Sequence, residues 1–273
     1  MPRQDGKRGR RESPARSRDA SMKLEAELSL AKKAAQRAAT LLSGLLAKPI
    51  EVDSAIDRDV KLAADREAET LIVETLRDGS PYPVLSEESG CIGETRSDRT
   101  RWIVDPLDGS LNFLRGIPFC GVSIGLWQDD APLLGVIHDL RTGESFSGIV
   151  GAGAWLDDAK VHVSAVSKPS EAILCTGFPI GMDFSRSAIT AYAEQVLNFK
   201  RTRLIGSAAL SLAYLAAGRV DAYYERGIKI WDVAAGLAIV KAAGGAIFHT
   251  AADPKKHTLD VEASNGLLTR VNA

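Results

Sequence analysis

Residues 102–119, which read WIVDPLDGSLNFLRGIPF, constrain the fold more than any other stretch of the chain. The hydrophobic residues 102–104 predict a buried strand. Pro106 predicts that this strand stops at Asp105, because proline cannot donate a ladder hydrogen bond and forces an extended residue before it. Asp105 and Asp108 then share one turn. Two carboxylates held together at the end of a buried strand raise each other's pKa unless a cation or a proton lies between them, and a hard divalent metal ion is the simplest such cation.

Gly109 and Ser110 follow the two aspartates directly. Glycine lets the backbone approach a ligand closely, and free backbone N–H groups at a turn-to-helix junction favour an anion such as phosphate. An ordinary turn is the alternative interpretation, since Asp-Pro and Asp-Gly pairs are common in turns. Two further acidic sites, Glu87-Glu88 and Asp232, lie in segments of the same character and favour a metal site.

Three segments together resemble the signatures of the inositol monophosphatase family of Mg²⁺-dependent, lithium-sensitive phosphatases. They are LSEES at 85–89, DPLDGSLNF at 105–113 and WDVAAG at 231–236, in the order and with the spacing of that family. The resemblance extends from about residue 26 to the C-terminus. It implies an α/β (α+β) layered sandwich with the αβαβα arrangement of the sugar-phosphatase type, and a homodimer.

The resemblance implies a set of residues that supply oxygen ligands to Mg²⁺: Glu87, Asp105, Leu107 through its carbonyl, Asp108, Asp232 and Asp65. Glu87, Asp105 and Leu107 hold one ion in this pattern, while Asp105, Asp108 and Asp232 hold a second. Oxygen ligands alone suit Mg²⁺ or Mn²⁺, and nothing in the sequence resembles a His/Cys zinc set. Asp105, Glu87 and Ser110 are the catalytic residues, with Glu87 and the Ser110 hydroxyl activating the attacking water.

Asp65 occupies the position at which the family reaches a third, weaker metal ion. On the residues alone it is the N-cap of a helix over 65–79. The chain departs from the family here, because Ala63 and Ala64 stand before Asp65 where the family usually has threonine. The number of metal ions, two or three, therefore stays open.

The substrate-binding residues that the resemblance implies lie in three segments of the chain: Asp108, Gly109 and Ser110, then Gly206, Ser207 and Ala208, then Glu225. Gly206 and Ser207 precede a predicted helix over 208–217, where they are also an ordinary helix cap. Glu225 ends a predicted strand over 221–225. In the family an acid at this position binds hydroxyls of the inositol ring, and a solvated strand-end glutamate is the alternative.

The sequence constrains the identity of the substrate less than it constrains the metal ligands. Leu111 follows Ser110, where members acting on nucleoside bisphosphates or histidinol phosphate often have lysine. We expect a phosphoric monoester hydrolase acting on inositol 1-phosphate or a similar small sugar phosphate by a metal-activated water. Fructose-1,6-bisphosphatase or 3′(2′),5′-bisphosphate nucleotidase activity at the same site is the alternative. A role of another class, as an accessory protein of the RNA transcription machinery, is also open.

Amino-acid composition limits which broad classes of protein the chain can belong to. The chain has 273 residues, of which 45% are hydrophobic and 25% charged, as expected of a soluble globular protein. The net charge of -1 gives no reason to expect a nucleic-acid partner. Three cysteines without a CxxC pair fit a reduced cytoplasm, and no apolar run is long enough to cross a membrane.

We expect a disordered basic tail over residues 1–21, to which we assign no function, followed by one catalytic domain over 22–273. An N-terminal α+β lobe spans about 22–165 and a C-terminal α/β lobe about 166–273. The further predicted elements follow from hydrophobic periodicity and turn signals. They are helices over 28–45, 185–199 and 233–243, with Asp232 as the N-cap of the last, and strands over 84–85, 121–127, 133–138, 144–150, 154–156, 172–177 and 203–205.

Overall fold

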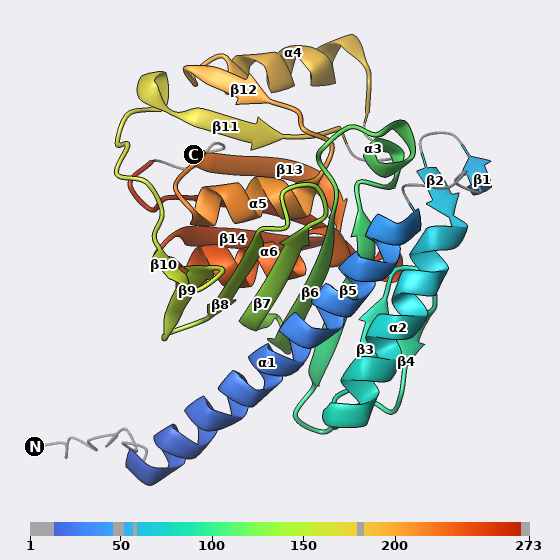
Figure 1. Cartoon of the computed structure of the whole chain (residues 1–273). Coiled ribbons are helices and arrows are strands. Elements are labelled where there is room, and N and C mark those ends of the chain that lie inside the picture. Colours follow the sequence, from blue (N-terminus) through green and yellow to red (C-terminus); the bar gives the residue numbers. More distant parts are fainter. Residues whose placement is uncertain (1–13, 46–51, 57–58, 179–182, 269–273) are drawn as a thin grey trace, which may run out of the picture.

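The computed structural model describes residues 14–45, 52–56, 59–178 and 183–268 (Figure 1). The first helix, α1 (Pro14–Leu45), begins inside the segment that the sequence predicts to be a disordered tail. Proline is favoured in the first turn of a helix, and the alanine and arginine residues that follow are good helix formers. The rest of that segment, residues 1–13, lies outside the described residues.

The larger sheet has eight strands in the order β10-β9-β8-β7-β6-β5-β3-β4. Neighbouring strands are antiparallel, except that β3 and β5 are parallel. The strands are β3 (Val84–Ser86), β4 (Gly90–Ile92), β5 (Thr100–Asp108), β6 (Gly121–Gln128), β7 (Ala131–Asp139), β8 (Ser145–Ile149), β9 (Gly153–Leu156) and β10 (Ala159–Val161).

Strand β5 does not stop before Pro106, so that sequence prediction is wrong. Asp105 pairs with Ser123 of β6, and Asp108 pairs with Gly121. Between these two pairs β5 contains one more residue than β6, which is a β-bulge. Such a bulge tolerates proline, because the bulged residues leave the regular ladder. The bulge places both aspartates on the strand itself rather than in a loop after it.

The smaller sheet has five strands in the order β12-β11-β13-β15-β14, with β11 parallel to both of its neighbours. The two other neighbouring pairs, β13 with β15 and β14 with β15, are antiparallel. The strand predicted over 203–205 is displaced to β12. The strands are β11 (Ile173–Thr176), β12 (Arg201–Arg203), β13 (Ala222–Lys229), β14 (Ala246–Asp253) and β15 (Thr258–Ser264). A separate antiparallel pair, β1 (Val52–Ile56) and β2 (Asp59–Leu62), precedes α2.

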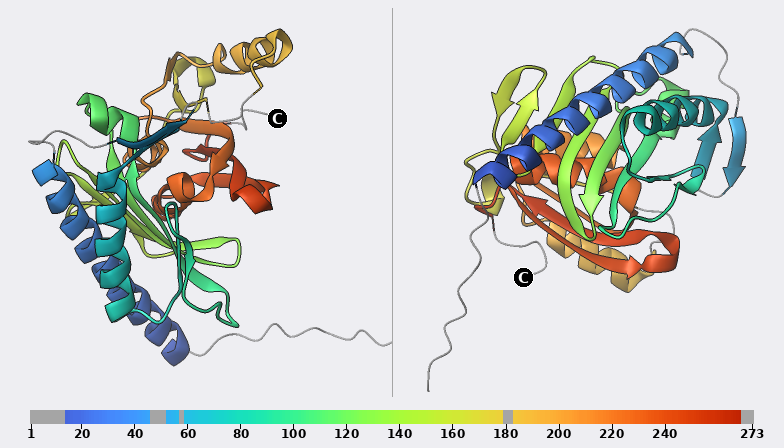
Figure 2. Two further views of the ribbon diagram at one scale, coloured as in Figure 1. Left: turned by 90° about the vertical axis from the view of Figure 1, so that its right-hand side faces the viewer. Right: turned by 90° about the horizontal axis from the view of Figure 1, so that it is seen from below.

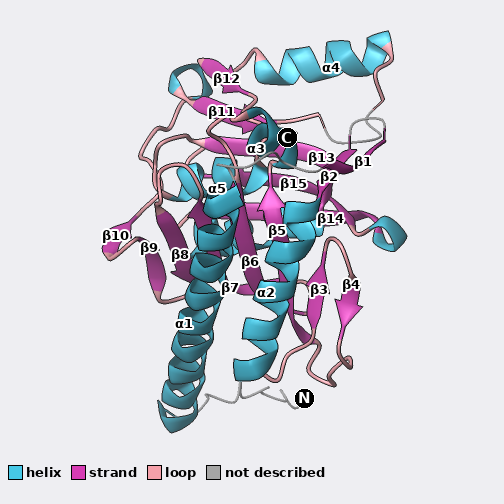
Figure 3. Cartoon of the chain, turned by 45° about the vertical axis from the view of Figure 1, so that its right-hand side comes forward, coloured by secondary structure: helices cyan, strands magenta, loops and turns pink. Residues whose placement is uncertain are grey.

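Helices and sheets alternate in layers, as Figures 1 and 2 show. Helices α1 and α2 (Ala63–Gly79) run side by side over one face of the larger sheet (Figure 3). Helices α5 (Ala208–Ala216) and α6 (Ile230–Ala242) lie between the two sheets, and α4 (Arg186–Val196) covers the outer face of the smaller one. This is the predicted αβαβα sandwich. Among the helices of the described residues, none combines the length and the apolar character that crossing a membrane requires.

Small residues let α6 lie close to its neighbours. A side chain added at Gly236 would overlap Leu212 of α5, and one added at Gly125 of β6 would come within 3.0 Å of the α6 backbone. The helix is therefore held tightly between α5 and the larger sheet. Its first turn, which carries Asp232, is positioned by this packing.

Candidate active site

Acidic side chains from three elements gather at one edge of the larger sheet. Asp105 and Asp108 lie in the bulge near the end of β5, and Glu87 follows the parallel strand β3, whose end lies at the same edge. Asp232 is the third residue of α6, so its predicted role as N-cap is wrong: the helix already begins at Ile230. It stays in the first turn, where the helix dipole favours a carboxylate.

The electrostatics of these acids indicate that they lie close enough to affect one another. Burial raises the pKa of Asp105 well above its ordinary value, and the negative charges of Glu87, Asp108 and Asp232 raise it further. Burial likewise raises the pKa of Asp232, with Glu87 and Asp108 adding to the shift. The largest charges acting on Asp105 are all negative, so the cluster carries an excess of buried negative charge.

The chemistry of this cluster fits a hard divalent cation. Carboxylate oxygens from Glu87, Asp105, Asp108 and Asp232 are the ligands that Mg²⁺ and Mn²⁺ prefer, and a cation would compensate their mutual repulsion. Within the described ranges, no three Asp, Glu, His or Cys side chains are arranged to hold a metal ion as they stand. Metal binding by these residues therefore stays a prediction that rests on charge and donor type.

Asp108 also links β5 to the start of α5. Its Oδ2 accepts hydrogen bonds from the Ser207 hydroxyl and from the Ala209 backbone N–H, the latter at 2.9 Å. These donors oppose the effect of burial, which raises the pKa of Asp108 to about 6. Ser207 is the N-cap of α5, as predicted, and accepts from the Leu210 N–H at 3.1 Å.

Ser110 lies beside two of the predicted metal ligands. Its Oγ donates to the Leu107 carbonyl oxygen at 2.9 Å and lies 3.4 Å from Asp65 Oδ1. Asp65 is not the N-cap of α2, because that helix begins at Ala63. It is the third helical residue, and its Oδ2 accepts from the Leu62 backbone N–H at 2.7 Å. Both corrections, at Asp65 and Asp232, move the acid by less than one helical turn.

Gly109 fills a position that only glycine fits. Its φ is 88°, in the left-handed region, and a Cβ there would lie 2.7 Å from the Phe119 carbonyl oxygen. Gly109 is also the N-cap of the short helix α3 (Ser110–Arg115). The turn-to-helix junction predicted at Gly109 and Ser110 is thus present.

A pocket of about 210 Å³ adjoins the acidic cluster. Of the predicted site residues, those that line it are Asp108, Gly206, Ser207, Ala208, Glu225 and Asp232. Glu87, Asp105, Gly109 and Ser110 are not part of its lining. The structure thus brings the predicted substrate residues of the second half of the chain to one cavity, next to two of the predicted metal ligands.

Glu225 is fixed in this pocket by two residues that sequence reasoning missed. The Tyr223 hydroxyl donates to Glu225 Oε2 at 2.7 Å, and both side chains are buried. A Cβ at Gly177 would lie 2.7 Å from either carboxylate oxygen, so the absence of a side chain there makes room for the acid. Burial raises the pKa of Glu225 to about 7. Tyr223 and Glu225 are two residues apart in one strand, so their side chains lie on the same face of the sheet. This spacing is a signal that the sequence did contain.

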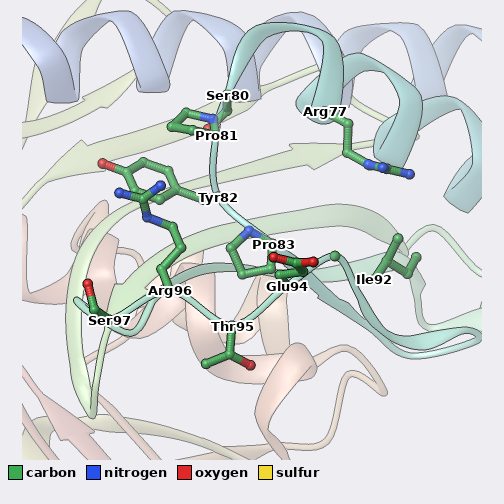
Figure 4. Close-up of a pocket in the computed structure, with 11 residues that line it drawn as sticks. Arg77, Ser80, Pro81, Tyr82, Pro83, Ile92, Glu94, Thr95, Arg96 and Ser97 are labelled. Carbon is green, nitrogen blue, oxygen red and sulfur yellow. The ribbon is translucent and has the colours of Figure 1, made fainter.

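A larger pocket of about 540 Å³ lies elsewhere, between the end of α2 and the segment after β4 (Figure 4). Pro83 lines it from the start of β3, whereas Glu87 follows the other end of that strand. Arg96, which lies over the Tyr82 ring, forms an ion pair with Asp98 at 3.3 Å. Size alone therefore does not identify the site, because this pocket is remote from the acidic cluster.

The layered fold and the acidic pocket place the chain among α/β sandwich proteins of the sugar-phosphatase type. The profile of the inositol monophosphatase family matches residues 23–272, and the chain belongs to that family. It is 36% identical over 222 residues to the protein named Nus factor SuhB from Haemophilus influenzae, covering 77% of this chain and 82% of that one.

Two further relatives are named as inositol monophosphatases. The chain is 39% identical over 184 residues to an inositol-1-monophosphatase from Mesorhizobium japonicum, covering 67% of this chain and 69% of that protein. The inositol monophosphatase from Anabaena superposes with a TM-score of 0.78 at 34% identity, covering 90% of this chain and 92% of that one. The relatives therefore support a phosphatase fold and leave the substrate open.

Proposed function

We propose that this protein is a metal-dependent phosphomonoesterase that hydrolyses inositol 1-phosphate or a similar small sugar phosphate. The observation that carries the proposal is the acidic cluster of buried Asp105 and Asp108 with half-buried Asp232 and Glu87, beside a pocket that Glu225 lines. Carboxylates that lie close together raise each other's pKa, and perturbed carboxylates next to a cleft are typical of functional sites.

Glu87, Asp105, Asp108, Asp232 and the Leu107 carbonyl would hold the cation, which when bound supplies positive charge that lowers the pKa of water and neutralises the departing oxygen. The carboxylate of Glu87 accepts a proton from the attacking water as general base. The Ser110 hydroxyl lies next to the Leu107 carbonyl and orients that water. The backbone N–H groups of Gly109 and Ser110 bind the phosphoryl oxygens, at a junction where free donors favour an anion.

The pocket favours a small alcohol as the leaving group. At about 210 Å³ it is smaller than the roughly 300–1,000 Å³ of a site for a drug-sized ligand. Glu225 offers two acceptor oxygens for hydroxyl groups, and Tyr223 fixes their position. Fructose 1,6-bisphosphate and 3′(2′),5′-bisphosphate nucleotides would use the same residues, with a different alcohol beside Glu225.

Phosphate release from a panel of substrates tests the proposal. The panel contains inositol 1-phosphate, fructose 1,6-bisphosphate, 3′-phosphoadenosine 5′-phosphate, histidinol phosphate and NADP, each with and without Mg²⁺ and with lithium added. We expect Mg²⁺-dependent, lithium-inhibited release that strongly favours inositol 1-phosphate. Preference for another substrate would keep the mechanism and replace the substrate, whereas release from none of them would contradict the proposal.

A second candidate function comes from the relatives named Nus factor SuhB, which support a role with the transcription machinery. Two properties separate this role from catalysis: binding to such a partner would not need Mg²⁺, and Asp105→Asn would not affect it. A pull-down with wild type and Asp105→Asn in the presence of EDTA distinguishes the two. We also infer a homodimer from the family, which light scattering of the full chain tests.

A further inference from the structure

An exposed aromatic residue, Phe178, lines the site pocket. Phe178 follows β11 through Gly177 and lines the pocket together with Thr176 and Glu225. Its side chain is 39% exposed, which is unusual for a phenylalanine next to a buried strand. An aromatic residue with exposed surface therefore borders the cavity in which the leaving group is proposed to bind.

Two other aromatic rings contact the ring of Phe178. The Tyr192 ring of α4 lies 4.9 Å away and the Phe184 ring 6.0 Å away, between centroids. Both neighbours are tilted, at 47° and 54°, so neither stacks flat on Phe178. The Tyr192 hydroxyl also lies 3.4 Å from the Thr176 Oγ1, which ties α4 to the end of β11. Tyr192 and Phe184 thus support the orientation of the Phe178 ring, while part of the Phe178 surface stays exposed.

Phe178 and Glu225 present adjoining apolar and polar surfaces. The carboxylate of Glu225 lies against Gly177, where a Cβ would be 2.7 Å from its oxygens, and Phe178 is the next residue of the chain. A ligand that fills this pocket therefore meets a hydrogen-bond acceptor and an aromatic ring on neighbouring walls. Cyclic polyols have this dual character, because their hydroxyls radiate from the ring edge while C–H bonds cover its faces.

Resting on the proposed phosphatase function, we propose that Phe178 is a specificity-determining residue that packs its ring against the C–H face of a cyclic polyol in the leaving group. The face of an aromatic ring carries partial negative charge and attracts the weakly positive C–H hydrogens, and the contact also removes apolar surface from water. Glu225 accepts hydrogen bonds from the hydroxyls at the edge of the same polyol. An acyclic polyol phosphate has no flat C–H face and gains little from Phe178.

The experiment compares Phe178→Ala with wild type on inositol 1-phosphate and on the acyclic glycerol 2-phosphate, both with saturating Mg²⁺. We expect kcat/KM for inositol 1-phosphate to fall by about 10-fold or more, mainly through KM, as for other lost apolar contacts to a substrate. The value for glycerol 2-phosphate changes little. Phe178→Tyr keeps the ring and restores the preference for the cyclic substrate.

Phe184→Ala is the matched control. Phe184 is 44% exposed and belongs to the same aromatic cluster, but it does not line the pocket. We expect this variant to keep the wild-type ratio between the two substrates. Equal losses on both substrates in Phe178→Ala, an unchanged ratio, or the same selective loss in Phe184→Ala would each overturn the assignment of Phe178 while leaving the proposed function intact. No phosphate release by wild type from inositol 1-phosphate, from glycerol 2-phosphate or from any other substrate of the panel would overturn the proposed function and this inference with it.

Discussion

The side-chain amide of Asn112 donates a hydrogen bond at 2.8 Å to the carbonyl oxygen of Ile205, a residue 93 positions away in the sequence. A second bond of 2.8 Å runs from the same amide nitrogen to the Phe119 carbonyl oxygen. Asn112 thereby joins α3, which begins with Ser110, to the segment that leads into Gly206 and Ser207. Two of the three predicted substrate-binding segments, 108–110 and 206–208, are connected through this one buried side chain.

Asn112→Ala should weaken both the fold and the site, because it leaves the carbonyl groups of two half-buried residues without their donor. We expect the free energy of unfolding to fall by about 1–3 kcal/mol, measured by urea denaturation, together with a lower kcat/KM. Asn198→Ala is the control, since Asn198 is exposed and donates to the Glu194 carbonyl of its own helix end. Equal stability of the two variants would contradict the connecting role of Asn112.

Glu225 makes the stability of the metal-free protein depend on pH. Its pKa is raised from 4.5 to about 7, so the folded state holds a proton that the unfolded state has already lost in this interval. The contribution of Glu225 to the free energy of unfolding therefore falls as pH rises through this window, by roughly 3 kcal/mol in total. Glu225→Gln should be more stable than wild type at about pH 8 and equal to it near pH 4, measured by urea denaturation in EDTA. A variant less stable than wild type at the higher pH would contradict the raised pKa.

Gly177→Ala should displace the Glu225 carboxylate, because the added Cβ would lie 2.7 Å from both of its oxygens. We expect KM for inositol 1-phosphate to rise while the fold is retained, measured by steady-state kinetics and circular dichroism. Gly44→Ala in α1 is the matched control, because no atom lies within 4 Å of the added Cβ. It should leave kinetics unchanged and stabilise the helix by up to about 1 kcal/mol. Unchanged KM in Gly177→Ala would argue against a role of Glu225 in binding.

Mg²⁺ should raise the Tm of the wild-type protein, because a ligand that binds only the folded state stabilises it. Asp105→Asn removes one charge from the cluster, so it should raise the Tm of the metal-free protein and abolish the response to Mg²⁺. The exposed acid Asp130 provides the control, since Asp130→Asn should respond like wild type. Differential scanning fluorimetry with and without Mg²⁺ measures this. A full Mg²⁺ response in Asp105→Asn would contradict the assignment of the cluster as the metal site.

The layered fold was predicted through the resemblance to the inositol monophosphatase family, which three short motifs in order carry, whereas hydrophobic periodicity predicted single helices and strands. The predictions misplaced features that depend on exact backbone geometry. Pro106 predicted the end of a strand because proline has no backbone N–H to donate, whereas the bulge lets β5 continue. Asp65 and Asp232 are the third residues of their helices rather than N-caps. Strands β14 and β15 were not predicted at all. Strand β14 lies at the sheet edge and several of its side chains are exposed, so it has no clear apolar alternation.

The residues of the site that the sequence missed depend on contacts between distant segments. Gly177 acts through the space it leaves for Glu225, and Asn112 acts through carbonyl groups far along the chain. Phe178 is one of seven phenylalanines, and nothing in its neighbours indicates that its ring faces the pocket. Such relationships follow from tertiary packing and leave no periodic or motif signal in one sequence.

The most direct test of the central claim is phosphate release from inositol 1-phosphate by wild type and Asp105→Asn, measured with Mg²⁺ on samples whose folding is verified by circular dichroism. The buried acidic cluster is proposed to hold the cation on which hydrolysis depends. We therefore expect Mg²⁺-dependent turnover by wild type and none by the folded Asp105→Asn variant. Turnover retained in Asp105→Asn, or turnover by wild type that does not need a divalent cation, would contradict this account.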